Sequence, residues 1–306
     1  MNIIIIGLGS IGKKHVDAIF SVIPNANIFA LRSARTKDVY KNVENIYPGD
    51  SLPNSIDFVI ISNVTSMHEA TILEMLHYKF PLFIEKPVLG SLNKADEILK
   101  KIEKENILTY VACNLRFHPA IKFTKNYLAT NKPRINEVNI YCGSYLPDWR
   151  PNRDFKTVYS ANKEMGGGVH LDLIHEIDYC LWLFGFPESF IVSKQSVSSL
   201  AISAIDSVNY HLTYIDFGVN ITLNYYRRDA KRTLEILTND DTLTIDLIKS
   251  NVRSNLTGNV LFQSEMKIED TYIDQIRYFI DKVKSKEQPM NSFKNALQVL
   301  KIAMYE

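Results

Sequence analysis

The sequence predicts an N-terminal Rossmann domain with a doubly wound parallel sheet, followed by a C-terminal α/β domain built on a large, mostly antiparallel, open-faced sheet. Three observations predict this fold class. Strands alternate with helices over the first third, a glycine-rich turn follows the first strand, and short turns join successive strands beyond about residue 130. The length of 306 residues agrees with two domains of roughly 150 residues each.

The first third of the chain repeats a strand–helix pattern. Ile3–Ile6 is a continuous β-branched run, which is typical of a parallel strand buried on both faces. Ser66 and Glu69 have the spacing of a capping box and predict the start of a helix. Further strands are expected at Asn27–Leu31, Phe58–Ser62, Pro81–Ile84 and Leu108–Ala112, and helices at about Ile11–Val22, Ser66–Tyr78 and Asp96–Asn106.

The later part of the chain alternates apolar and polar residues, as in Val208–Tyr214, which is typical of strands with one packed face. Turn residues such as Asp216-Phe217-Gly218 separate these runs. Strands are expected at Ile135–Leu146, Phe190–Ser198, Ser207–Ile215, Val219–Tyr226, Thr233–Thr238, Thr242–Ile248 and Asn259–Ser264, and helices at about Leu171–Phe184, Thr271–Lys284 and Asn291–Tyr305. The expected domains are residues 1–118 and 119–306, with a last helix able to pack back on the first domain.

Composition excludes several classes of protein. Lys and Arg total 35 against 34 Asp and Glu, so a nucleic-acid partner is not expected. Three widely spaced cysteines without a CxxC pair argue against a disulfide framework or a zinc site, and favour a reducing cytoplasm. We expect no signal peptide, because a strand-like run begins at Met1, and no membrane span, because no long apolar stretch is present.

The motif Gly7-Leu8-Gly9-Ser10-Ile11-Gly12 has the pattern G-x-G-x-x-G and lies between the first strand and the first helix. This context predicts a dinucleotide site. Gly7 makes the turn, Gly9 lets a pyrophosphate approach the backbone, and Gly12 packs the helix on the strand. Ser10 and Ile11 begin the helix, whose N-terminus would face the phosphates.

The end of the second strand carries Arg32, Ser33 and Arg35, where a carboxylate would bind the ribose 2′-hydroxyl of NAD. Guanidinium and hydroxyl groups donate hydrogen bonds to phosphate oxygens, whereas a carboxylate repels them. The sequence therefore predicts that NADP(H) is preferred, with NAD(H) possible. The alternative is that Arg32 only stacks on the adenine.

Three further motifs combine into a candidate catalytic set. Glu85-Lys86-Pro87 follows a strand of the parallel sheet, at the edge where ligands bind in such sheets. Asn114–Pro119 follows the last strand of that sheet. Gly166–Tyr179 opens the helix of the second domain. On this helix Asp172, His175 and Asp178 are spaced by three, so neighbouring pairs of them share a face.

In this order, these motifs resemble the Gfo/Idh/MocA family (glucose–fructose oxidoreductase, inositol dehydrogenase, MocA), over essentially the whole chain. In that family the lysine of the Glu-Lys-Pro motif contacts nicotinamide and substrate, and the Lys–Pro bond is often cis; Lys86 and Pro87 match these positions. Asp172 and His175 are three residues apart where the family usually has four, so which of them contacts the substrate stays open. Tyr145–Pro151 and Tyr159–Ala161 are similar to a subgroup that accompanies surface-sugar biosynthesis.

The chemistry of the residues agrees with this resemblance. His175 titrates near neutrality, so it suits a general base in oxidation and a general acid in reduction. Asp172 would fix its tautomer or hold its charge, and Lys86 would stabilise a developing alkoxide. The alternative for His175 is a structural histidine on a packed helix. We expect no metal, although His170, Asp172 and His175 could be mistaken for ligands.

The remaining candidates complete two expected sites. His68 matches a family histidine that orients a loop, and Tyr210, Tyr214, Tyr225 and Tyr226 are expected in sheet packing or a subunit contact. The expected cofactor site is Gly7, Gly9, Ser10, Ile11, Gly12, Arg32, Ser33, Arg35, Asn63, His68, Glu85, Lys86 and Asn114. The expected substrate site is Arg116, Arg150, Arg153, Tyr159, Asp172 and His175.

The function expected from these sites is an NAD(P)(H)-dependent oxidoreductase. It would transfer a hydride between nicotinamide and a secondary alcohol or ketone of a sugar, sugar acid or nucleotide sugar. Two alternatives stay open: a lyase or glycosidase that oxidises transiently and retains its cofactor, and a dinucleotide-sensing regulatory protein. The family's dimers and tetramers imply a homo-oligomer formed through the C-terminal sheet, with no nucleic-acid or membrane partner.

Overall fold

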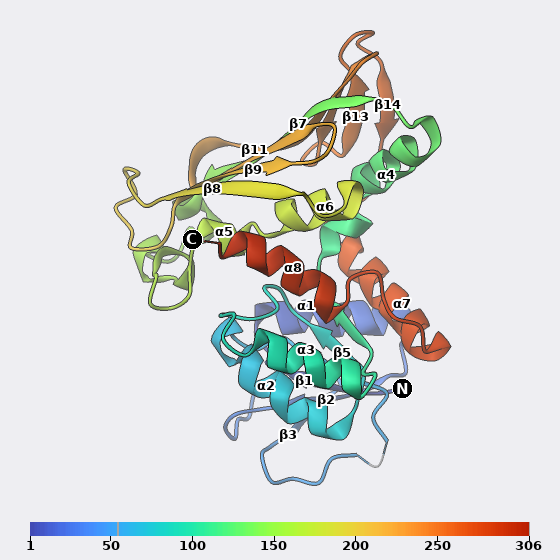
Figure 1. The fold of residues 1–306 in the computed structure, drawn as a ribbon. Coiled ribbons are helices and arrows are strands. Elements are labelled where there is room, and N and C mark those ends of the chain that lie inside the picture. The colour runs from blue at the N-terminus through green and yellow to red at the C-terminus, as the bar shows by residue number, and fades with distance from the viewer. Residues whose placement is uncertain (54, 306) are drawn as a thin grey trace. The chain divides into compact units, whose positions relative to one another are not determined.

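The chain forms two compact units in the computed structural model, which describes residues 1–53 and 55–305 (Figure 1). The first unit contains Met1–Asn114 and Ile268–Leu300, and the second contains Leu115–Lys267 and the residues from Lys301 onward. The sequence placed a boundary at residue 118 and allowed the last helix to pack back on the first domain. In the structure the chain returns to the first unit after Lys267 and stays in it to Leu300.

A six-stranded parallel sheet forms the centre of the first unit, in the order β3-β2-β1-β4-β5-β6. Its central strands are buried on both faces; Ile3, Ile5, Val59 and Phe83 are all fully buried. The strand β3 was not expected from the sequence, because its four residues form no apolar run. The strands are β1 Asn2–Ile6, β2 Asn27–Leu31, β3 Val43–Ile46, β4 Phe58–Ile61, β5 Leu82–Ile84 and β6 Thr109–Val111.

Helices connect these strands and cover the sheet (Figure 1). The predicted capping box at Ser66 is wrong, because neither Val64 nor Met67 caps with a side chain and the helix begins at His68 after a 3₁₀ turn. The helices of this unit are α1 Ser10–Val22, α2 His68–Met75, α3 Ala95–Lys104 and α7 Asp270–Ser285, with 3₁₀ turns at Thr65–Met67 and Leu76–Tyr78. A further helix, α8 Phe293–Ala303, runs from the first unit into the second.

Aromatic packing explains why the C-terminal segment belongs to the first unit. Phe279 of α7 lies with its ring centroid 5.2 Å from that of Phe58, 5.4 Å from that of Phe83 and 5.8 Å from that of Tyr110. All four side chains are fully buried. Burial of such rings contributes about 1.5–3 kcal/mol each, and it fixes α7 on the sheet.

An eight-stranded sheet forms the second unit, in the order β14-β13-β12-β11-β7-β10-β9-β8. All of its pairs are antiparallel except β10 with β7, which are parallel. The strands are β7 Ile135–Tyr145, β8 Ser189–Gln195, β9 Ser207–Thr213, β10 Gly218–Asn224, β11 Tyr226–Thr238, β12 Thr242–Asp246, β13 Asn251–Ser254 and β14 Val260–Gln263. The sequence missed β13.

The two faces of this sheet differ in chemistry. Val138, Ile221 and Leu234 are fully buried on one face. The other face carries a polar row in which Asn220 donates to Asn139 and contacts the ring of His211. The helices of this unit are α4 Pro119–Asn131, α5 Val169–Asp172 and α6 His175–Phe184, with 3₁₀ turns at Asn114–Phe117, Leu146–Trp149, Phe155–Thr157 and Tyr159–Ala161.

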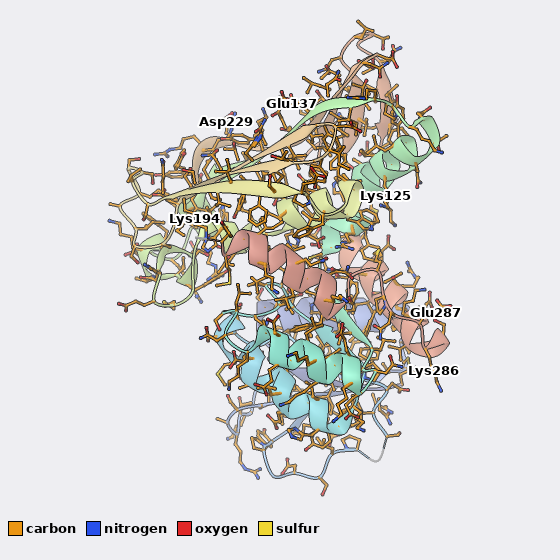
Figure 2. All side chains as sticks on the ribbon, in the orientation of Figure 1. Lys125, Glu137, Lys194, Asp229, Lys286 and Glu287 are labelled. Atoms are coloured by element: carbon orange, nitrogen blue, oxygen red, sulfur yellow. The ribbon has the colours of Figure 1, made fainter. Side chains whose placement is uncertain are left out.

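The helix predicted at 171–184 is two helices, and α4 was not expected. Because α5 ends at Asp172 and α6 begins at His175, the prediction that Asp172 and His175 share one continuous helix is wrong. Lys125 of α4, labelled in Figure 2, donates to the carbonyl of Trp182 in α6 over 2.7 Å, and this hydrogen bond joins α4 to α6.

A buried ion pair also holds α6. The guanidinium of Arg116 donates to both carboxylate oxygens of Asp178, over 2.8 Å and 2.7 Å, and both side chains are at most 4% exposed. The three cysteines, Cys113, Cys142 and Cys180, are free and buried. Burial raises the pKa of the Cys180 thiol to about 12 and that of Cys142 further.

We expect Asp178→Ala to lower the free energy of unfolding by about 3–5 kcal/mol, because it leaves the Arg116 charge buried without its carboxylate. Urea unfolding monitored by circular dichroism measures this loss. The double variant Arg116→Met/Asp178→Leu should be more stable than Asp178→Ala, since it removes both charges. A single variant as stable as the wild type would contradict the role assigned to this pair.

Candidate active site

The glycine loop after β1 is shaped by close backbone contacts. A Cβ at Gly7, which has a φ of +95°, would lie 2.4 Å from the amide nitrogen of Asn63. A Cβ at Gly12 would lie 2.3 Å from the carbonyl oxygen of Gly7. A Cβ at Gly9 would meet nothing within 4 Å. Gly7 and Gly12 are therefore required by packing, whereas Gly9 borders open space that a ligand can approach.

This loop lies at the point where the strand order reverses, between β1 and β4. Ligands of doubly wound sheets bind at such a point. The helix α1 begins here with Ser10 and Ile11, and no side chain caps it, so its first amide groups can bind an anion. Asn63 donates to the hydroxyl of Thr71 over 2.8 Å, and its buried Oδ1 has no partner among the described residues. These features fit a dinucleotide cofactor.

The end of β2 places three of the predicted cofactor residues near one another in sequence and near β3. The guanidinium of Arg32 lies 3.5 Å from the side-chain oxygen of Asn45, and that of Arg35 lies 4.9 Å from the ring centre of Tyr47. Ser33 and Arg35 are exposed. Basic and hydroxyl groups therefore follow β2, with no carboxylate at positions 32–35.

The end of β5 is linked to α1 through Glu85. One carboxylate oxygen of Glu85 lies 2.6 Å from Nε2 of His15, and the other accepts from the backbone amide of Lys86 over 3.0 Å. His15 is fully buried and packs against Phe83. The Lys86–Pro87 peptide is cis, as the resemblance implied. Glu85 thus fixes the backbone from which the Lys86 side chain extends.

His68 is also fully buried in the first unit. Its Nδ1 lies 3.0 Å from the carbonyl oxygen of Pro87, and its Nε2 lies 3.2 Å from that of Asn63. Burial lowers the pKa of His68. A neutral ring carries one N–H, so it donates to only one of these two carbonyl oxygens and contacts the other without a hydrogen bond. Asn114, after β6, donates to the hydroxyl of Thr271 in α7 over 2.8 Å.

Asp172 ends α5 and is held by a residue that the sequence placed elsewhere. The hydroxyl of Tyr225 donates to Oδ2 of Asp172 over 2.5 Å, and Tyr225 is fully buried. Burial and the nearby Asp172 carboxylate raise the pKa of Tyr225, so it remains a hydrogen-bond donor. The full burial of Tyr225 agrees with the packing role expected from the sequence, and its hydroxyl in addition holds Asp172.

The glycine run before α5 determines how this region folds. A Cβ at Gly167 would lie 1.9 Å from the carbonyl oxygen of Tyr159, and Gly168 has a φ of +146° beside the ring of His170. Only glycine allows this approach of the Tyr159–Ala161 turn to the start of α5. Tyr159 is half-buried here, whereas Arg153, six residues earlier, is exposed.

The structure separates the predicted substrate residues into three settings. Asp172 is buried, and His175, half-buried, begins α6 a few residues later. Arg150 and Arg153 lie exposed in a loop. Arg116 is buried in its ion pair with Asp178, so its guanidinium is directed at a carboxylate of the same unit.

The described residues contain neither a metal-binding cluster nor a helix able to span a membrane. No group of three or more His, Cys, Asp or Glu side chains among them is arranged to hold a metal ion. No helix in the same part of the chain combines the length and the apolar character needed to cross a membrane.

Residues 1–113 match the model of the GFO_IDH_MocA family, described as an oxidoreductase family with an NAD-binding Rossmann fold. The myo-inositol 2-dehydrogenase of Thermotoga maritima is 21% identical over 310 residues, which cover 94% of this chain and 90% of that protein. The N-terminal 113 residues are therefore similar to the NAD-binding domain of the Gfo/Idh/MocA oxidoreductases. The chain spans 62% of the length of the uncharacterized oxidoreductase YrbE of Bacillus subtilis and 51% of that of an inositol 2-dehydrogenase/D-chiro-inositol 3-dehydrogenase of Lacticaseibacillus casei.

Two solved structures share the fold of this chain over nearly its whole length. Levoglucosan dehydrogenase in complex with NADH superimposes with a TM-score of 0.84 at 16% identity, covering 99% of this chain and 95% of that one. UDP-N-acetylglucosamine 3-dehydrogenase GnnA from Acidithiobacillus ferrooxidans gives a TM-score of 0.78 at 17% identity, with the same coverage. At these identities the likeness establishes the fold.

Two buried histidines of the second unit predict a pH dependence of stability. Burial lowers the pKa of His118 and of His170 from 6.5 to about 4. Between these pH values the unfolded chain binds protons that the native chain does not. We expect the free energy of unfolding to be constant with respect to these groups above pH 6.5 and to fall as the pH decreases toward 4.

Denaturant unfolding at several pH values in this interval measures how steeply the free energy of unfolding falls as the pH decreases. His170→Gln should make this fall less steep, since the unfolded state then gains one proton fewer. His211→Gln, at an exposed position on the sheet, is the matched control for removal of an imidazole. A wild-type stability that rises on acidification from pH 6.5 to about 4 would contradict the buried, neutral state of these rings.

Proposed function

We propose that this protein is an NAD(P)(H)-dependent dehydrogenase or reductase of the Gfo/Idh/MocA family. It transfers a hydride between nicotinamide and a secondary alcohol or ketone of a sugar, sugar acid or nucleotide sugar. The observation that carries the proposal is the cradle at the reversal of strand order, where open space borders Gly9 and the buried Oδ1 of Asn63 lacks a partner among the described residues. The names of the inositol, levoglucosan and nucleotide-sugar dehydrogenases support the substrate class.

The first unit holds the cofactor in this proposal. The amide groups at the start of α1 bind the pyrophosphate, and Asn63 supplies an acceptor from the end of β4. Glu85, bonded to His15 and to the Lys86 amide, fixes the position of Lys86 relative to the glycine loop. His68 and Asn114 hold the loops around this site. The bound cofactor supplies the hydride acceptor or donor.

The chain's own residues move the proton. His175 takes the hydroxyl proton when the alcohol is oxidised and returns it when the ketone is reduced. Asp172, fixed by Tyr225, keeps the imidazole oriented and favours its protonated form. The Lys86 ammonium stabilises the negative charge that develops on the substrate oxygen. Arg150, Arg153 and Tyr159 bind substrate hydroxyl or acidic groups, and Arg116 supports this site by holding Asp178.

NADP(H) is the preferred cofactor in this proposal. Arg32, Ser33 and Arg35 follow β2 and supply donors for a ribose 2′-phosphate, and Asn45 lies beside the Arg32 guanidinium. The protein is proposed to act in the cytoplasm as a homodimer or homotetramer, with the exposed polar face of the eight-stranded sheet as the subunit contact.

We expect the purified protein to bind NADPH more tightly than NADH. Arg32→Ala should weaken NADPH binding by about tenfold or more and leave NADH binding nearly unchanged, because a charge-assisted hydrogen bond is lost. Fluorescence titration of each reduced cofactor measures this without turnover. Lys37→Ala, which removes a nearby exposed positive charge, is the matched control. Equal binding of the two cofactors by the wild type, or tighter binding of NADH, would contradict the proposed preference for NADP(H).

Replacement of the catalytic residues tests the reaction. On whichever of myo-inositol, D-glucose and UDP-N-acetylglucosamine the wild type oxidises fastest, His175→Ala should lower kcat by about 10²–10⁴-fold while cofactor binding is retained. Lys86→Ala should lower kcat as well, and His211→Ala should not. Turnover of His175→Ala near the wild-type rate would refute the role of His175. Consumption of substrate without net change in cofactor absorbance would instead indicate a cofactor-retaining lyase or glycosidase.

A further inference from the structure

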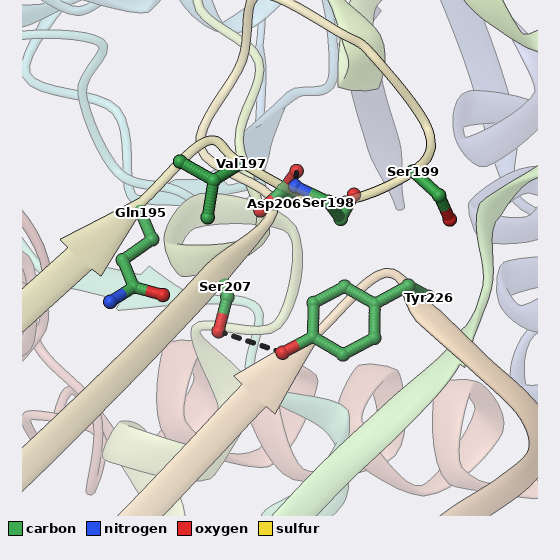
Figure 3. Close-up of a pocket in the computed structure, with 7 residues that line it drawn as sticks. All are labelled: Gln195, Val197, Ser198, Ser199, Asp206, Ser207 and Tyr226. Carbon is green, nitrogen blue, oxygen red and sulfur yellow. Dashed lines mark hydrogen bonds between the residues drawn. The ribbon is translucent and has the colours of Figure 1, made fainter.

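A cavity of about 320 Å³ lies in the second unit where β8 passes to β9 (Figure 3). It is bordered by the end of β8, the loop that follows, and the first residues of β9 and β11. The residues that line it are Gln195, Val197, Ser198, Ser199, Asp206, Ser207 and Tyr226. None of them belongs to the site proposed for hydride transfer, so the cavity is a separate feature of the molecule.

Asp206 is the buried polar group of this cavity. It is 1% exposed, and its Oδ2 accepts from the backbone amide of Ser198 over 3.0 Å. Its own backbone is also paired, since its amide donates to Gln195 and its carbonyl accepts from Tyr225, each over 3.0 Å. Its Oδ1 has no hydrogen-bond partner among the described residues. A buried carboxylate oxygen without a partner is costly, so a donor from a bound water or from a ligand would stabilise this wall of the cavity.

The other walls provide groups that suit hydroxyl ligands. Serine hydroxyls and the Gln195 amide both donate and accept, as a ligand hydroxyl does. Tyr226 donates from its hydroxyl to Ser207 over 3.2 Å, which fixes its ring across the cavity (Figure 3). The ring is 40% exposed and offers a flat apolar surface. Alternating hydroxyl groups and apolar C–H faces are the chemistry of a sugar or cyclic polyol.

The lining does not offer the ligand set of a metal cation. Asp206 is the one acidic residue of the lining, and no group of three or more His, Cys, Asp or Glu side chains among the described residues is arranged to hold a metal ion. Arg227 and Arg228 follow Tyr226, but their guanidinium groups lie over the rings of Tyr141 and Tyr145, and Arg227 also pairs with Asp229. An uncharged hydroxyl can therefore supply the donor that the free oxygen of Asp206 lacks. The volume is at the small end of the range for ligand pockets, roughly 300–1,000 Å³.

We propose that this cavity binds a small uncharged polyol of monosaccharide size, one hydroxyl of which donates to Oδ1 of Asp206. The site is independent of the reacting residues and does not require that the proposed hydride transfer be correct.

Isothermal titration calorimetry of the full chain with D-glucose and with myo-inositol tests the proposal. We expect saturable binding of at least one of them, weakened about tenfold or more in Asp206→Asn. The asparagine keeps an acceptor for the Ser198 amide but turns an NH₂ donor toward the cavity. Asp216→Asn makes the same chemical change at an exposed carboxylate and should bind as the wild type does. Should Asp206→Asn fail to fold, Tyr226→Ala is expected to show the same loss.

His175→Ala separates this site from the proposed catalytic one, because binding in the cavity should persist in that variant. Four results would overturn the proposal: no saturable heat with either polyol, Asp206→Asn and Tyr226→Ala binding like the wild type, loss of binding in His175→Ala alone, or saturation by potassium or ammonium chloride in place of the polyols. Binding that persists in a protein without dehydrogenase activity would leave the cavity proposal intact and refute only the proposed function.

Discussion

The close approach of two strand ends is the constraint on which the first unit depends. Gly7 passes so near the backbone of Asn63 that no side chain fits between them, and Gly12 then packs on the Gly7 carbonyl. This contact sets where α1 begins, leaves its first amides uncapped and brings the Asn63 side chain beside the loop. Through His15 of α1 and Glu85 after β5, the same contact extends to the backbone of Lys86.

Buried charges have the corresponding role in the second unit. Glu176 is fully buried and accepts from Arg232 over 2.6 Å and 3.1 Å, while Arg116 holds Asp178 on the same helix. Tyr225 fixes Asp172 just before that helix. The bend between β10 and β11 carries Tyr225 to the buried side and Tyr226 to the cavity, so one short segment serves both places. Removal of any one partner leaves the other desolvated, which makes this arrangement rigid.

Short sequence motifs predicted the parts of the structure that depend on neighbouring residues. The sequence predicted the glycine motif, the cis Lys86–Pro87 bond and the alternation of strands with helices. Each of these features is marked by residues that are close together in the sequence. The helix α4 was missed although its signals are present: Pro119 is its first residue and the His118 side chain caps it by accepting from the Ala120 amide. The strand β3 has no apolar run to mark it.

Other features depend on contacts that no short window contains. The break between α5 and α6 falls at Leu173–Ile174, which includes neither glycine nor proline. The helical spacing of apolar residues continues across these two positions, so the sequence predicted one helix. The return of α7 to the first unit depends on Phe279 meeting rings that are more than 150 residues away in sequence. The hydrogen bond from Tyr225 to Asp172 and the unpaired oxygen of Asp206 likewise depend on tertiary contacts.

The burial of the three cysteines determines how their thiols react with alkylating and oxidising reagents. A thiolate, not a thiol, reacts with electrophiles and oxidants, and burial holds Cys142 and Cys180 in the protonated form. Enclosed in the interior, none of the three sulfur atoms can be alkylated until the surrounding structure opens. The rate at which each cysteine is alkylated therefore measures how often the structure around it opens.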